Sequence, residues 1–339
     1  MNENVSDLKG KLDDYMDYMW DGFTPEVQTS NTIQIVLLRR TKSYNIFTTE
    51  GQELNITNTP TTIDGDDNID RVVMFKRKQV ASERRTGKEI LRSLDLVPVE
   101  ESEEDDYPMS EGMACRLHDN LCQNCIDCKL YGFAASGGGN SRSSRVLTDS
   151  AFTLRDIEIV RDNLTLNAQS EEHEAESSAA LSSRSHTIPE TYIPSVITLK
   201  DVTWRELVWM INVLQKTTRY GAETSRTGYL RNHILLVRFG LDEPVSNLEL
   251  TQETTKKLEN YYEDVAFSTE MKSKDVLKST KDAAKDLIDK FGTGGEMMKT
   301  DELEEFIESV NSLAENEGDL REFLKELHEE QLNHERKES

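Results

Sequence analysis

Hydrophobic and polar residues follow short regular patterns in the first 250 residues, and these patterns predict an α+β fold. The stretch NTIQIVLLRR at 31–40 places Ile33, Ile35 and Leu37 at alternate positions, which is typical of a buried strand. Pro194 predicts a strand near a sheet edge, because proline cannot donate a hydrogen bond to a neighbouring strand. The other strands predicted in this way are 43–50 and 53–58, forming a hairpin around Gly51, then 71–75, 146–154, 156–162, 191–199 and 232–240.

Apolar residues recur at helical spacing in two further segments and throughout the rest of the chain. Residues 76–96 predict a helix with apolar side chains on one side. Residues 204–215 begin with Thr203 and Glu206 at the spacing of a helix capping box. Residues 251–339 predict several acidic helices separated by glycine-containing linkers. We expect this last region to be accessory and to contact the core or a neighbouring protein.

All four cysteines of the chain lie within one short segment. Their spacing, Cys-x6-Cys-x2-Cys-x2-Cys, turns pairs of thiolates toward one soft divalent ion, and tetrahedral zinc takes four such ligands. An iron–sulfur cluster or a redox pair is an alternative, but the proline that often closes an iron–sulfur run is missing. His118 is a possible replacement for one ligand. The predicted structural Zn²⁺ ligands are Cys115, Cys122, Cys125 and Cys128.

The overall charge is strongly acidic, with 64 Asp and Glu against 40 Lys and Arg and a formal net charge of −24. Such a protein repels nucleic acids and anionic membranes at long range. The same composition suits proteins of high-salt cells, or serves solubility alone. No apolar run is long enough for a membrane span, and the acidic start is unlike a signal peptide. We therefore expect a cytoplasmic protein without membrane contact, where clustered cysteines favour metal over disulfides.

Two basic clusters depart from this acidic background. Residues 76–92 hold seven basic and two acidic residues, and residues 216–231 hold four basic residues and one acidic residue, with tyrosines between them. Clustered like charges in an acidic chain repel one another, which weakens the interpretation as a merely solvated helix face, so that phosphate binding and a solvated face both stay open for residues 76–92. Basic residues interleaved with aromatic residues suit single-stranded RNA.

A glycine-rich loop at 132–145 follows the cysteines and carries Arg142 and Arg145. Backbone N–H groups and arginines in such a loop are able to approach phosphates, although a flexible linker has the same composition. The loop lacks the ending of a nucleotide P-loop and the spacing of a dinucleotide fingerprint, which argues against ATP and NAD.

Three motifs together resemble one known family. They are Cys-x2-Cys-x2-Cys-x-Leu-Tyr-Gly at 122–132, Arg-Val-Leu-Thr-Asp at 145–149, and TRYGAETSRTG at 218–228, continuing to SNLELT at 246–251. The chain is similar to the type I-D member of the repeated backbone subunits of CRISPR interference complexes, the Cas-seven-like family of the RAMP superfamily. The resemblance covers roughly residues 30–250, and the acidic helices beyond it are not anchored to the family.

The resemblance implies an RRM-like (ferredoxin-like) core with an inserted zinc-binding subdomain. It also implies several copies that polymerise along a crRNA (guide RNA) without reading its sequence, together with other subunits of the complex and a target nucleic acid. The expected parts are residues 1–99 and 136–250 as the two halves of the core, 100–135 as the zinc-binding insertion, 165–186 as a disordered or protruding loop, and 251–339 as the acidic helices. The expected RNA contacts, with Tyr220 stacking on a base, are Lys76, Arg77, Lys78, Arg84, Arg85, Lys88, Arg142, Arg145, Arg219, Tyr220 and Arg226.

Two other functions stay open at this point. Related backbone subunits cleave target RNA with an aspartate near the strand, and Asp149 or the aspartates of 64–70 are conceivable counterparts. A single aspartate without a metal or base constellation is weak support, so the sequence does not decide whether the protein is an enzyme. The other alternative is a zinc-containing RNA-binding assembly protein unrelated to CRISPR defence.

Overall fold

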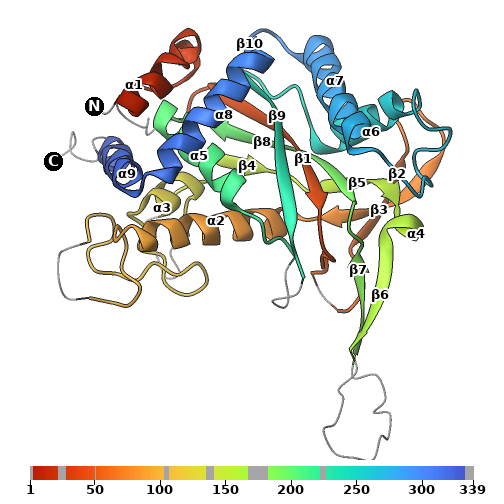
Figure 1. Cartoon of the computed structure of the whole chain (residues 1–339), viewed down its shortest axis with the longest axis horizontal. Coiled ribbons are helices and arrows are strands. Elements are labelled where there is room, and N and C mark those ends of the chain that lie inside the picture. The colour runs from red at the N-terminus through yellow and green to blue at the C-terminus, as the bar shows by residue number, and fades with distance from the viewer. Residues whose placement is uncertain are drawn as a thin grey trace, which may run out of the picture.

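The computed structural model is an α+β fold in which one large antiparallel sheet organises the chain (Figure 1). The residues that the structure describes are 3–21, 28–49, 51–102, 107–134, 141–166, 182–221 and 227–332. Within these described ranges, no helix is long and apolar enough to cross a membrane.

The large sheet has five strands in the order β10-β9-β1-β8-β4, and every neighbouring pair is antiparallel. The strands are β1 (Thr32–Thr41), β4 (Val146–Thr148), β8 (Tyr192–Lys200), β9 (Leu230–Gly240) and β10 (Glu296–Met297). Helix α2 (Lys76–Ser93) lies between β1 and β4 in the chain, and α5 (Trp204–Lys216) lies between β8 and β9. The central strand β1 therefore pairs with two strands that follow it by more than 150 residues.

Helices cover both faces of the large sheet. On one face, Ile35 and Leu37 pack with α2 and α5 in the largest hydrophobic cluster. On the other face, Val36 and Leu236 pack against α6 (Asn247–Leu258) and α7 (Ser273–Phe291). β1 is consequently buried on both sides, which explains the uninterrupted apolar run from Ile35 to Leu38 in its centre.

Several insertions extend from this core. A second sheet joins β2 (Ile56–Pro60), β3 (Asn68–Met74) and β5 (Ala151–Asp156). The hairpin of β6 (Arg161–Leu166) and β7 (Ser182–Thr187) projects away from the body (Figure 1). The inner part of the loop predicted at 165–186 lies outside the described residues. The cysteine segment folds around the short helix α3 (Ile126–Tyr131) beside α2.

The terminal elements belong to the main core. The N-terminal elements are α1 (Glu3–Gly10) and the 3-10 helix η1 (Asp13–Tyr18), and the C-terminal ones are α8 (Thr300–Glu315) and α9 (Glu317–Leu332). Phe306 of α8 and Phe323 of α9 are buried in the largest hydrophobic cluster. This cluster also contains the side chains of the sheet face that α2 and α5 cover. The acidic helices thus contact the core, which is one of the two possibilities expected from the sequence, and they are integral to the fold.

The structure departs from the predicted strands because distant segments compete for the same backbone groups. The hairpin at 43–58 was wrong: Asn45 bridges to Thr187, and β2 begins only at Ile56 and pairs with β3. The stretch 146–154 is split between β4 and β5 in different sheets. Residues 157–160 form the short helix α4 (Ile157–Val160), because the Asp156 carboxylate accepts a hydrogen bond from the Glu158 N–H and caps it.

The sequence predicted that the strand containing Pro194 lies near a sheet edge, and this prediction was wrong. β8 lies between β1 and β4, but β4 pairs only with residues 197–199. Pro194 pairs with Leu38 of β1 and lies in the half of β8 that β4 does not reach. The missing N–H of proline is tolerated there for the same physical reason that places proline on edge strands.

Candidate nucleic-acid interface and metal site

Helix α2 brings its charged side chains to three different sides, because residues three or four apart share a side of a helix. Glu83 points to the sheet, where its Oε1 lies 3.0 Å from Nη2 of Arg39, and both side chains are fully buried. Arg84, Lys88 and Arg92 point to the cysteine segment. Lys78 and Arg85 line an open cleft. The basic cluster of the sequence is therefore divided between structural and accessible positions.

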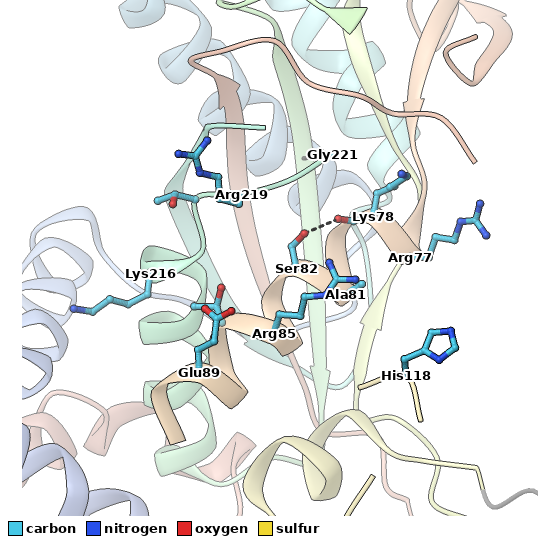
Figure 2. Close-up of a pocket in the computed structure, with 12 residues that line it drawn as sticks. Arg77, Lys78, Ala81, Ser82, Arg85, Glu89, His118, Lys216, Arg219 and Gly221 are labelled. Atoms are coloured by element: carbon cyan, nitrogen blue, oxygen red, sulfur yellow. Dashed lines mark hydrogen bonds between the residues drawn. The ribbon is translucent and has the colours of Figure 1, made fainter. Parts of the chain in front are cut away.

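We call this opening the basic cleft; its volume is about 670 Å³ (Figure 2). It brings together the two basic clusters of the sequence, since α2 forms one wall and the segment after α5 forms the other. Glu89 is the single carboxylate among its described lining residues. The charged and titratable residues that line it are Arg77, Lys78, Arg85, Glu89, His118, Lys216 and Arg219.

The cations of the basic cleft are largely uncompensated. Among the described residues, Arg85 and Lys216 have no carboxylate partner, and both are exposed. Arg219 donates to the backbone oxygen of Thr227 and lies over the ring of Tyr229, 5.5 Å from its centre. Burial, together with the positive charges of Arg77, Arg85 and Arg184, lowers the pKa of Lys78. The cleft thus holds the positive potential that a phosphate chain requires.

Gly221 allows the second wall of the cleft to lie against the body. Its φ is +58°, and a Cβ atom there would lie 2.6 Å from the backbone oxygen of Ile46. The N–H of Ile46 donates to the Gly221 oxygen at 2.9 Å, which fixes the segment in this place. A side chain at position 221 would push the segment with Arg219 away from α2.

Four of the side chains predicted to contact RNA are used inside the fold instead. Arg84 donates hydrogen bonds from Nε and Nη2 to the carboxylate of Asp127, and Lys88 is buried among the cysteines. Arg145 is buried and pairs with Glu206 of α5. Tyr220 is fully buried, so its ring is not accessible for stacking on a base. The assignments of Lys88, Arg145 and Tyr220 are corrected, because each is buried and has internal partners. Arg84 also has an internal partner but keeps 11% of its side chain exposed, so its contact with RNA stays a prediction.

Tyr220 belongs to a buried polar network that holds α2 on the sheet. Its hydroxyl donates to Glu83 at 3.3 Å and accepts from Nδ2 of Asn232 at 2.9 Å. The guanidinium of Arg39 lies over its ring, 4.9 Å from the centre. Burial and the charge of Glu83 raise the pKa of the Tyr220 hydroxyl, so it stays a neutral donor.

The remaining predicted contacts lie in three different places. Arg226 is outside the described residues. Arg142 is half-buried beside the cysteine segment, where its backbone pairs with that of Phe133, and it does not line the basic cleft. Lys76 is exposed and, with Arg77, lines a second groove on the other side of α2.

Sequence reasoning missed this second groove, which has a volume of about 700 Å³. Phe75, Val80 and Leu117 give it an apolar lining, and Phe75 is 37% exposed. Arg77 and Ala81 line both openings, so the groove adjoins the basic cleft across one ridge of α2. A phenylalanine directly before a basic helix was the one available signal in the sequence.

The four cysteine sulfurs form a compact group that could hold a metal ion, since all lie within 4.8 Å of one another. The Sγ of Cys115 is 3.6 Å from that of Cys128 and 3.8 Å from that of Cys125. Four thiolates around tetrahedral zinc, with bonds of about 2.3 Å, have sulfurs about 3.8 Å apart. The Cys125 N–H also donates to the Cys122 Sγ at 3.3 Å, so the residues present fit such an ion. His118 is not part of the group and lines the basic cleft (Figure 2).

The aspartates proposed for cleavage lie apart from the basic cleft. Asp149 is exposed in the connection from β4 to β5, and its backbone oxygen accepts hydrogen bonds from Gln79 and Asn247. Within the described ranges, the cysteines are the one group of three or more potential metal ligands. None of the aspartates of 64–70 lines the cleft. Cleavage through Asp149 stays a prediction.

Comparison with known proteins assigns the chain to a family of CRISPR proteins. The family model described as Csc2 Crispr matches residues 20–324. The chain therefore belongs to the Csc2 family, the type I-D Cas-seven-like backbone subunits of CRISPR systems. The match includes most of the acidic helices, which the sequence motifs had not anchored to the family.

Solved structures are similar to the chain at low identity. The crystal structure of Thermofilum pendens Csc2 has a TM-score of 0.62 and 19% identity, covering 94% of this chain and 96% of that one. A chain of a CRISPR RNA-guided surveillance complex, pre-nicking, has a TM-score of 0.46 and 9% identity, covering 79% of this chain and 91% of its own. A chain of a CRISPR RNA-guided surveillance complex has a TM-score of 0.46 and 8% identity, with coverages of 78% and 87%. No curated protein matches the chain.

Proposed function

We propose that this protein binds crRNA through the basic cleft, by its phosphates and without reading base sequence, and that copies of it polymerise along the guide. The observation that carries the proposal is the meeting of two distant basic clusters in one cleft of a protein with a net charge of −24. Phosphate contacts fix a strand in place but carry no sequence information. Guide RNA, further copies, other subunits and a guide-selected target are the partners.

Helices cover the face of the sheet on which RNA could otherwise lie, and this supports a path for the RNA strand along α2. Many RRM domains stack bases on the open face of a four-stranded sheet. Here Val36, Val196 and Leu236 on that face are buried under α7, so the sheet offers no platform for bases. The cleft on the outer side of α2 remains, and its cations come from α2 and from the segment after α5.

We also propose that the core is RRM-like (ferredoxin-like) and that the cysteines hold structural zinc. The order β9-β1-β8-β4, with helices α2 and α5 as the two crossovers, has the βαββαβ arrangement of that fold. The close packing of the four sulfurs suits one ion; in an iron–sulfur cluster the thiolates bind different irons and lie further apart. The proposed parts are 1–99 and 136–250 for the core, 100–135 for the zinc-binding insertion and 251–339 for the acidic helices.

Salt dependence of RNA binding tests the phosphate contacts. We expect Arg85→Gln and Arg219→Gln to weaken binding equally for RNAs of unrelated sequence. Each change should also reduce the slope of log affinity against log salt by about 0.7, the value for one cation on a single strand. Lys285→Gln is the matched control, because Lys285 is exposed on α7 away from the cleft. Fluorescence anisotropy at several salt concentrations measures both quantities.

Wild-type affinity and slope in both cleft variants would overturn the proposed cleft. Polymerisation is tested separately by native mass spectrometry with RNAs of increasing length. The number of bound copies should rise in steps with length, and a fixed stoichiometry would contradict head-to-tail growth.

A further inference from the structure

Lys88 lies against three of the four cysteines although it is not a ligand. Its side chain is 2% exposed, and its Nζ is 2.8 Å from Cys115 Sγ. The same atom is 3.8 Å from Cys128 Sγ and 3.9 Å from Cys125 Sγ. A buried ammonium group is costly unless nearby negative charge compensates it. The three sulfurs are the groups closest to it besides one carboxylate.

That carboxylate does not balance the local charge by itself. Oδ2 of Asp127 lies 2.8 Å from Lys88 Nζ and also 2.8 Å from Nη2 of Arg84. Two cations therefore share one carboxylate in a region where all three side chains are nearly buried. Four thiolates around one divalent ion leave two negative charges in excess. The surplus cation of Lys88 thus matches the charge of a metal–thiolate site and has no other evident counter-charge among the described residues.

The contacts from α2 to the cysteine segment form one continuous stripe. Arg84, Lys88 and Arg92 are four residues apart and share one side of the helix. Arg92 completes the stripe by donating from Nη2 to the backbone oxygen of Cys115 at 2.6 Å. The adjacent side of the same helix carries Lys78 and Arg85 into the basic cleft. The position of the cleft cations is therefore tied to the cysteine segment through α2.

We propose that Lys88 is the counter-ion of the metal–thiolate site, and that occupancy of this site holds α2 where its cleft cations bind RNA. Lys88 is a positioning residue: it donates N–H···S hydrogen bonds that withdraw charge from the thiolates and fixes their segment to the helix. Groups that hydrogen-bond to metal ligands in this way alter metal affinity by about 10- to 100-fold. The coupling to RNA rests on the proposed function, whereas the role at the metal does not.

Zinc release tests the role at the metal without any RNA. Lys88→Met removes the ammonium and keeps the apolar stem, while Arg84 still satisfies Asp127. We expect a chromogenic chelator to remove zinc about 10- to 100-fold faster from this variant than from wild type. Lys88→Arg should restore slow release in part. Lys76→Met, an exposed position on the same helix, is the control and should release zinc like wild type.

Cobalt substitution supplies a readout that a purely structural lysine would not change. The thiolate-to-cobalt charge-transfer band should move to longer wavelength in Lys88→Met, because the sulfur loses a hydrogen bond that withdrew its charge. An unchanged band together with unchanged zinc release would show that Lys88 is only an ion-pair partner of Asp127. That pair of results would overturn the proposal.

RNA binding by metal-loaded and metal-depleted wild type tests the coupling. Depletion should weaken binding by about 5- to 150-fold, the usual range for coupled sites, and reloading with Zn²⁺ should restore it. Arg85→Gln should weaken RNA binding while releasing zinc like wild type. Equal RNA affinity of depleted and loaded protein would overturn the coupling. Absence of RNA binding by loaded wild type would overturn the proposed function and leave the zinc results standing.

Discussion

Arg145 shows at the scale of one residue how a predicted ligand contact becomes a structural one. It follows a glycine-rich loop, a context that favours phosphate binding, yet its guanidinium forms a two-pronged ion pair with Glu206. Glu206 also accepts from the Thr203 N–H, which completes the capping box of α5. The capping box was predicted from the sequence and is confirmed. The partner of its glutamate, 61 residues away, gave no local signal.

Removing Arg145 should destabilise the fold and leave the RNA-binding chemistry intact. Arg145→Met would leave the fully buried Glu206 carboxylate without its ion pair, at a cost of roughly 3–5 kcal/mol in the free energy of unfolding. Adding Glu206→Gln should recover part of this loss, since no buried charge then remains. Urea unfolding measures both variants. If the Arg145→Met variant had wild-type stability but bound RNA more weakly, Arg145 would instead be an RNA contact.

At the scale of elements, α9 is held on the body by charged groups that are partly desolvated. Arg205 of α5 pairs with Glu326 and Glu330 of α9, and His328 lies 3.0 Å from the backbone oxygen of Asn124. Burial raises the pKa of Glu330 to about 7, although the charge of Arg205 acts in the opposite direction. The helix thus carries a carboxyl group that keeps its proton near neutral pH.

This carboxyl group gives stability a defined pH dependence. The folded protein binds a proton at Glu330 up to about pH 7, whereas the unfolded chain releases it near pH 4.5, so stability falls as pH rises between these values. Glu330→Gln should remove this loss and be more stable than wild type at pH 8, by up to about 3 kcal/mol. At pH 4 the difference should vanish. Thermal unfolding across this range measures it, and a variant that is less stable at pH 8 would contradict the expectation.

Helix α2 shows how far an element can be predicted from its sequence. Its start at residue 76 and its helical periodicity follow from local pattern, and both are confirmed. The direction in which each basic side chain points does not follow from the local pattern, because it depends on which segments pack against the helix. Arg84 and Lys88 contact the cysteine segment and Glu83 contacts the sheet, through partners that lie 27 to 44 residues away in the sequence. Local patterns locate the metal ligands for the opposite reason: all four lie close together in the chain.

At the scale of the whole molecule, the large sheet is closed on both faces by helices far apart in the sequence. The strand pattern of β1 indicated burial, but not which helices supply it. α6 and α7 cover Val36 and Leu236, and α8 and α9 complete the cluster on the opposite face. Their acidic surfaces face solvent, which made them resemble an independent region.

Truncation should reveal this dependence. A chain that ends at residue 250 would expose the apolar face of the sheet that α7 now covers, including Val36 and Val196. We expect it to aggregate or to lose cooperative unfolding, because an uncovered apolar sheet face is an aggregation site. A chain that ends at residue 332 keeps every described contact and is the control. A cooperatively folded 1–250 fragment, measured by circular dichroism, would show that the helices are accessory after all.

The pairing of β1 also affects how this chain folds during its synthesis on the ribosome. β1 is made early, but its partners β8 and β9 are completed only at residues 200 and 240. The backbone groups on both edges of β1 therefore lack their strand partners during most of translation. Contacts between segments so distant in sequence also form slowly. Slower synthesis at low temperature, or a chaperone that shields the nascent strand, should raise the yield of native protein more than any change at the surface.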